Sequence, residues 1–257
     1  MITPQKSIHY ERYEFQKWEP HDAETIVETP VSLTVNSEVW LTFMCTPVDL
    51  EEMAVGFLYN EGVIESMDEV ADVRLCEHGD NVDVWLNRNV EQPHSWRRTS
   101  GCSGGLTAVE TLARVDVSFD GDKPRFPPEA IGKLVEMLFE SQELYRETGG
   151  VHTSALSDGE KILLSAEDIG RHNTLDKIAG LCLMNNVWPE RRILITTGRI
   201  SSEMLQKAAR LSAPILISRT SPSSLSIEMA ERYGITLIGY ARRNRFNVYS
   251  NPQRVGF

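Results

Sequence analysis

Residues 193–240 read ILITTGRISSEMLQKAARLSAPILISRTSPSSLSIEMAERYGITLIGY. Three short apolar runs in this stretch are typical of buried strands, and the two segments between them repeat apolar residues at helical spacing. The strands are expected at 193–196, 214–218 and 236–240, and the helices at 201–211 and 223–233. Strands that alternate with helices through short connections predict a parallel or mixed sheet covered by helices on both faces.

The same regular pattern extends back to residue 126, so residues 126–257 are expected to form one α/β domain, which opens with a single helix between Pro127 and Gly149. The preceding residues, 21–125, are expected to form a smaller β-rich part that ends with the segment around Cys102. Its strands are expected at 31–35, 38–45, 70–75 and 82–86, with one helix after Asp49. Residues 1–20 are polar and irregular in pattern and are expected to be a partly ordered lead-in.

The composition is ordinary for a soluble globular protein: 257 residues, of which 41% are hydrophobic and 25% charged. No apolar run approaches the roughly 18 residues of a membrane helix, and residues 1–10 lack an apolar signal core, so neither a membrane span nor export is expected. The net charge of −11 argues against general binding to nucleic acid or to an anionic membrane. The four cysteines show no metal or disulfide spacing, which favours a reducing cytoplasm.

One of these cysteines lies in an unusual setting, because residues 97–105 read RRTSGCSGG. Glycines keep bulk away from the Cys102 sulfur, and the preceding arginines favour the thiolate over the thiol. The segment therefore predicts a reactive nucleophile, although a Gly-rich turn that holds a Cys by chance remains the alternative. Cys45, Cys76 and Cys182 fall in apolar strand-like or helix-like runs and are interpreted as packing residues.

Polar residues follow the three expected strands of residues 193–240, at 197–199, 220–224 and 240–245. Ligands of open α/β sheets bind outside the carboxyl ends of the strands. The first two segments carry small hydroxyls that suit phosphate oxygens, although helix capping would need the same residue types. The third consists of Tyr240, Ala241, Arg242, Arg243, Asn244 and Arg245. Arginines bind phosphate bidentately, so this segment predicts a site for a nucleotide or pyrophosphate, with a solvated basic turn as the alternative.

Residues 167–173, EDIGRHN, collect a carboxylate, a guanidinium, an imidazole and an amide before an expected helix at 173–185. His172 could act as an acid–base catalyst or donate to a phosphate, and a helix-capping network is the alternative. His152 could be functional or structural. Neither histidine has the spacing of a metal ligand, and the motifs of a zinc deaminase are missing, so no metal site is expected.

Several of these motifs together resemble the formate dehydrogenase accessory sulfurtransferase family (FdhD). The resemblance extends from about residue 24 to the C-terminus and is most specific in the second half. The matching segments are 148–156, 167–173 with 175–177, 197–199 with 202–203 and 206–207, 222–225, and 245–249.

The resemblance implies a cytidine-deaminase-like, three-layer α/β/α domain without zinc, preceded by the smaller β-rich part. It also implies a function in sulfur transfer, because such proteins take sulfur from a cysteine desulfurase as a cysteine persulfide. They transfer that sulfur to the bis-guanine-dinucleotide form of the molybdenum cofactor, which then enters formate dehydrogenase. The family's active cysteine corresponds to Cys102 and its cofactor-binding segment to residues 240–245, and relatives are dimeric.

One position departs from the family's pattern. Many relatives carry Cys-x-x-Cys at the sulfur site, and here the second position is Gly105. A persulfide on Cys102 has no neighbouring cysteine to receive its sulfur, so transfer by one cysteine is expected. Two other functions remain possible from the residues: a hydrolase with a cysteine nucleophile and His172 as its base, and a cofactor-binding chaperone without sulfur chemistry.

Overall fold

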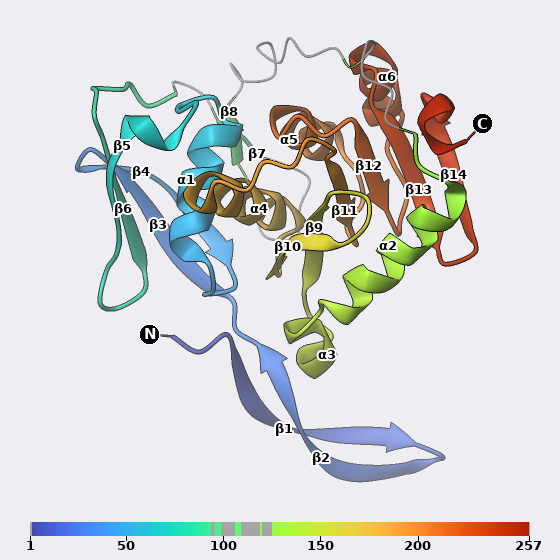
Figure 1. Ribbon diagram of the computed structural model, residues 1–257. Helices are drawn as coiled ribbons and strands as arrows, with labels where there is room; N and C mark the ends of the chain where they lie inside the picture. The colour runs from blue at the N-terminus through green and yellow to red at the C-terminus, as the bar shows by residue number, and fades with distance from the viewer. Residues whose placement is uncertain (1, 94–95, 99–105, 109–118, 120–124, 257) are drawn as a thin grey trace.

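The computed structural model describes residues 2–93, 96–98, 106–108, 119 and 125–256 (Figure 1). Its largest element is a mixed six-stranded sheet with the order β10-β9-β11-β12-β13-β14. The central strands β11, β12 and β13 are parallel, and the flanking pairs are antiparallel. The bounds are β9 (His152–Ser157), β10 (Ile162–Asp168), β11 (Ile193–Thr196), β12 (Ile215–Ser218), β13 (Thr236–Arg242) and β14 (Arg245–Ser250). The mixed sheet expected from residues 193–240 is therefore present.

Helices cover both faces of this sheet. On one face, α4 (Arg171–Asn185), α5 (Ser202–Arg210) and α6 (Ser224–Tyr233) pack against residues such as Leu194 and Leu216. On the other face, α2 (Pro128–Glu140) packs against residues such as Ile193 and Ile215. Adjacent residues of one strand point to opposite faces, which is why these strands are apolar at every position. The three layers expected from the sequence are present, while the likeness to cytidine deaminases stays a prediction.

A second, four-stranded sheet has the order β4-β3-β6-β5 and is covered by α1 (Leu50–Asn60). Its strands are β3 (Thr29–Val35), β4 (Glu38–Cys45), β5 (Val70–Leu75) and β6 (Asn81–Leu86), and a short 3-10 helix (Met67–Glu69) precedes β5. All four strands and the helix agree with the pattern read from residues 31–86. Division of the chain after residues 20 and 125 stays a prediction.

The two sheets are joined where α1 crosses α4. A Cβ atom added to Gly56 would overlap the carbonyl oxygen of Asp176, and one added to Gly180 would overlap the carbonyl oxygen of Glu52. The glycines thus allow the two helix backbones to touch. This contact holds the β-rich part against the α/β layers.

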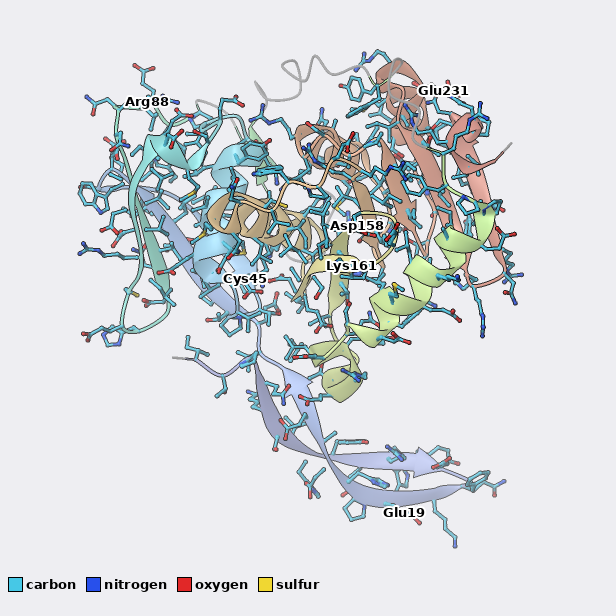
Figure 2. All side chains as sticks on the ribbon, viewed as in Figure 1. Glu19, Cys45, Arg88, Asp158, Lys161 and Glu231 are labelled. Atoms are coloured by element: carbon cyan, nitrogen blue, oxygen red, sulfur yellow. The ribbon has the colours of Figure 1, made fainter. Side chains whose placement is uncertain are left out.

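Residues 5–26 form a hairpin, so the prediction of an irregular lead-in is wrong. The strands β1 (Gln5–Glu14) and β2 (Lys17–Ile26) project from the body, and Glu19 lies on the projecting part (Figures 1 and 2). Phe15 and Gln16 occupy the turn with φ of 48° and 63°. Turns with two positive φ values favour Asn-Gly, so the sequence carried no turn signal here.

The long helix expected between Pro127 and Gly149 is two helices, α2 and α3 (Leu144–Thr148). The carboxylate of Glu167 causes α3 to begin as a separate helix. Its Oε2 accepts the backbone N–H groups of Glu143 and Leu144 at 2.9 and 2.7 Å. Because this acceptor comes from a different element, β10, no local sequence signal marks the break. None of the helices in the described ranges is long and apolar enough to cross a membrane.

Candidate functional site

Cys102 lies outside the described residues, but the backbone on either side of it is described. The short strands β7 (Trp96–Arg98) and β8 (Leu106–Ala108) form an antiparallel pair. Arg98 pairs directly with Leu106. In the sequence, the predicted nucleophile lies between these two strands.

The three other cysteines differ in exposure. Cys45 and Cys182 are fully buried, and burial raises the pKa of each thiol to about 12. Figure 2 shows Cys45 within the body of the protein, at the end of β4. Both therefore fit the interpretation as packing residues. Cys76 is only half-buried, just after β5, and its thiol donates to Oδ1 of Asp80 at 3.0 Å, so the packing interpretation does not hold for it.

The structure brings the three predicted strand ends together. The N–H of Arg219, after β12, donates to the carbonyl of Thr196 in β11 at 3.2 Å. The N–H of Tyr240 donates to the carbonyl of Thr220 at 3.0 Å. The parallel strands end at the same edge of the sheet, as expected for a ligand site of an open α/β sheet.

The segment 240–245 is a hairpin between β13 and β14 rather than an open turn. Tyr240 is 48% exposed with a φ of 52°, whereas Ala241 is fully buried. The Arg242 guanidinium turns back over β12: its Nη1 donates to the carbonyls of Arg219 and Ala241 at 2.7 and 2.8 Å.

Arg243 contacts a different residue. Its Nε lies 2.9 Å from Oε1 of Glu136 on α2. The two consecutive arginines therefore have different partners. Asn244, between the two strands, and Arg245, the first residue of β14, are exposed. The three predicted arginines are thus spread along the hairpin, and their guanidinium groups do not surround a single binding position.

A cavity of about 440 Å³ lies at the carboxyl ends of β11 and β12. Thr197, Arg219 and His152 line it together with Tyr145. Its remaining lining residues are Gln142, Gly149, Gly150, Val151 and Ile169. The sequence pointed to Thr197 but missed Arg219, although an arginine directly after a predicted parallel strand is a signal that could have found it.

Arg219 is the charged side chain among the described residues that line the cavity. The Arg219 guanidinium stacks on the Phe139 ring at 4.0 Å, and burial, followed by the charge of Arg242, lowers its pKa. Nδ1 of His152 lies 3.4 Å from Oγ1 of Thr197. Burial is the main cause that lowers the pKa of His152, and Arg171 lowers it further. The imidazole is therefore neutral at neutral pH.

Residues 167–173 form a structural network. Asp168 and Lys177 make an ion pair of 2.7 Å between two fully buried side chains. Oδ1 of Asp168 also accepts the Gly170 N–H at 2.7 Å and the Asn173 amide at 2.8 Å. Gly170, the N-cap residue of α4, has no side-chain capping hydrogen bond, so the Asp168 bonds form an interior network and not a helix cap.

His172 belongs to the interior as well. It is 4% exposed, its Nε2 lies 3.3 Å from Oγ of Ser201, and burial holds its pKa well below the ordinary value. A base this deeply enclosed cannot reach an external substrate, which speaks against the hydrolase alternative. Within the described ranges, no group of three or more His, Cys, Asp or Glu side chains could hold a metal ion.

The fold and this edge of the sheet define a class: an α/β protein with a cavity, lined by Arg219, at the ends of its parallel strands. The model of the FdhD/NarQ family matches residues 26–256, and the chain belongs to that family.

Relatives match over nearly the whole chain. "Sulfur carrier protein FdhD" of Bacillus subtilis (strain 168) is 36% identical over 259 residues, which cover 96% of this chain and 94% of the relative. The protein of the same name from Staphylococcus aureus (strain MRSA252) is 33% identical over 252 residues, which cover 95% and 94%. The crystal structure of a "putative formate dehydrogenase accessory protein" from Desulfotalea psychrophila superposes with a TM-score of 0.84 at 30% identity, over 98% of this chain and 99% of that one.

Proposed function

We propose that this chain is a cytoplasmic sulfurtransferase that carries sulfur on Cys102 from a cysteine desulfurase to the molybdenum cofactor of formate dehydrogenase. The observation that carries this proposal is the similarity to proteins named sulfur carrier, at 33% and 36% identity over nearly the full chain. The paired strands that flank the Cys102 segment are consistent with it. A homodimer is part of the proposal.

The first step is a thiol–persulfide exchange. The Cys102 thiolate attacks the terminal sulfur of a desulfurase persulfide, a new S–S bond forms on Cys102, and the desulfurase cysteine leaves as a thiolate. In the second step the terminal sulfur passes to a reduced molybdenum centre, which supplies the two electrons that convert it to sulfide. The S–S bond breaks and Cys102 returns to the thiolate. Because Gly105 stands where many relatives have a second cysteine, the sulfur atom of Cys102 both accepts and releases the transferred sulfur.

The substrate is the bis-guanine-dinucleotide form of the cofactor, and residues 240–245 with the loops at 197–199 and 221–224 are its proposed binding segments. The common edge at which β11, β12 and β13 end supports this assignment. Arg245 and Asn244 are exposed and free to reach phosphates, whereas Arg243 would first have to leave Glu136. Binding supplies positioning, and the transfer needs little acid–base catalysis.

Mass spectrometry after incubation with a cysteine desulfurase and cysteine tests the carrier. The wild-type protein should gain one sulfur atom on Cys102, Cys102→Ala should gain none, and Cys76→Ala should match the wild type. Persulfide at wild-type levels in Cys102→Ala would rule out the assigned carrier. In cells, formate dehydrogenase activated normally by Cys102→Ser would favour the chaperone function without sulfur chemistry.

A further inference from the structure

We propose that the hairpin formed by β1 and β2, called the arm from here on, pairs with the arm of a second copy of this chain. In this pairing β1 lies antiparallel to β1 of the second copy, and the tip of each arm enters a cavity at the base of the other. This interface specifies the homodimer of the proposed function and rests on it, but it does not depend on sulfur transfer.

The arm leaves two sheet edges open. Within the described ranges it is a two-stranded sheet of its own, with ten residues in each strand, and it projects from the body (Figure 1). Most of its side chains are exposed, so little apolar packing supports it. A lone two-stranded hairpin is marginally stable in water, and its unpaired N–H and C=O groups can bind another strand. A further strand along one edge would therefore stabilise the arm.

The two edges of the arm differ. The turn residues Phe15 and Gln16 both have positive φ. Such a two-residue turn closes with a hydrogen-bonded pair, here Glu14 and Lys17, so the odd-numbered residues of β1 turn their backbone groups outward. On β2 the outward positions are even-numbered, and one of them is Pro20, which has no N–H. β2 also contacts α3, whereas no proline interrupts β1, so β1 is the edge that can accept a strand.

Twofold symmetry restricts the register of two β1 strands. Because the axis is perpendicular to the joined sheet, residues on the same face of β1 must lie opposite each other. Two such registers overlap nearly the whole strand. One has Tyr10 on the axis and puts Lys6 opposite Glu14 of the second copy. The other has His9 on the axis and puts Lys6 opposite Arg12, which is unfavourable because like charges then face each other. Charge therefore favours the register with Tyr10 on the axis.

The favoured register brings the tip of one arm to the base of the other, with Phe15 opposite Gln5 of the second copy. A cavity of about 640 Å³ lies at this base, between residues 3–5, α3 and β10. Oε1 of Gln5 is buried and has no hydrogen-bond partner among the described residues, and the side-chain amide of Gln16 can supply the missing donor. Phe15 is 91% exposed, so its ring gains burial when it enters the cavity.

The cavity and the tip also have complementary charges. Four acidic residues line the cavity: Asp49, Glu143, Glu147 and Glu167. No lysine or arginine is among its described lining residues. Glu167 already accepts three backbone N–H groups, whereas the other three carboxylates form no ion pair within the described ranges. Lys17 follows the turn and lies opposite residue 3 of the second copy in the favoured register, so its ammonium can approach these carboxylates.

Sedimentation velocity of the full-length protein with two proline variants tests the edge. His9 and Asp22 form an ion pair across the arm, and both turn their N–H groups outward, His9 from β1 and Asp22 from β2. His9→Pro blocks the edge of β1 and should raise the Kd of the dimer by about tenfold or more. The matched control, Asp22→Pro, loses the same ion pair and should keep the wild-type Kd. Phe15→Ser, which removes the ring from the cavity, should also weaken the dimer.

Cross-linking tests the register, in a protein whose Cys76 and Cys102 are replaced by alanine. Tyr10→Cys should form a disulfide between two copies under mild oxidation, because a residue on the axis faces its own counterpart. His21→Cys is the control, since His21 pairs with Tyr10 from β2 and lies away from the axis. Lys6→Glu should weaken the dimer, and the addition of Glu14→Lys should restore it.

A monomeric wild-type protein would overturn the proposal, as would a dimer that His9→Pro or Phe15→Ser leaves unchanged. An equal loss in Asp22→Pro would show that the edge of β1 is not the interface, and absence of the Tyr10→Cys disulfide would exclude the register. The persulfide on Cys102 is measured separately. Sulfur loading of a monomeric wild-type protein would contradict this interface and leave the carrier function intact, whereas dimerisation as expected without sulfur loading would contradict the carrier function alone.

Discussion

Nζ of Lys177 lies 2.7 Å from Oδ2 of Asp168, and neither side chain is exposed to solvent. The pair also joins the two sheets. Asp168 ends β10 and accepts the backbone N–H of Thr46, which follows β4, at 3.0 Å. Nζ of Lys177 donates to the carbonyl of the same Thr46 at 3.2 Å. Residues of the EDIGRHN motif therefore hold the β-rich part against the α/β layers.

Loss of one partner of this pair should destabilise the whole protein. Lys177→Ala leaves the Asp168 carboxylate buried without its cation, and such a change typically costs about 3–5 kcal/mol. Urea unfolding should show this loss, and Lys161→Ala, an exposed lysine in the turn before β10, should leave the free energy of unfolding within about 0.5 kcal/mol of wild type. A midpoint for Lys177→Ala equal to that of wild type would contradict the role of the pair.

The contact between α1 and α4 gives a second prediction. Alanine normally stabilises a helix interior by about 1 kcal/mol relative to glycine. Gly56→Ala and Gly180→Ala should nevertheless destabilise, because each new Cβ would overlap a backbone carbonyl of the other helix. Lowered thermal midpoints for both variants, with Lys133→Ala on α2 unchanged, are the expected result. Higher thermal midpoints for these variants would show that α1 and α4 can move apart without loss of stability, and would contradict the prediction.

The sequence predicted most of the α/β layers because buried parallel strands are apolar on both faces. It missed the β1–β2 hairpin, whose exposed strands bury no face and whose turn is made by Phe15 and Gln16. At the site, sequence spacing grouped Arg242 with Arg243, but Arg242 bonds to backbone carbonyls and Arg243 pairs with Glu136 of α2. Arg219 packs on the ring of Phe139, which comes from another element, so this contact could not be read from local sequence.

Thiol reactivity should separate the cysteines. A pKa of about 12 keeps Cys45 and Cys182 protonated at pH 7.5, and burial also hides them from reagents. Brief treatment of the native protein with iodoacetamide should modify Cys102 first and Cys76 more slowly. Peptide mapping should find Cys45 and Cys182 modified only after unfolding in urea. Modification of Cys45 as fast as Cys102 in the native protein would contradict the assignment of Cys102 as the activated thiol.

The buried His172 should make stability depend on pH. Burial and the nearby Lys207 hold its pKa well below the ordinary value, so the native state keeps the imidazole neutral. In the unfolded chain the same imidazole takes up a proton below about pH 6.5. The unfolded state then binds more protons, and stability should fall as the pH drops from about 6.5 toward 5, by up to about 1.4 kcal/mol per pH unit for this group.

Urea unfolding at pH 7.5 and pH 5.5 measures this effect. His172→Gln should lower the stability at pH 7.5 but reduce the further loss at pH 5.5, because one of the groups that titrates on unfolding has been removed. His152, whose pKa is also lowered, keeps its own share of the pH dependence. The exposed His78 is the matched control, and His78→Gln should leave the difference between the two pH values unchanged. If His172→Gln kept the full difference, the imidazole would have to be protonated in the native state, in conflict with its enclosure beside Ser201 and Lys207.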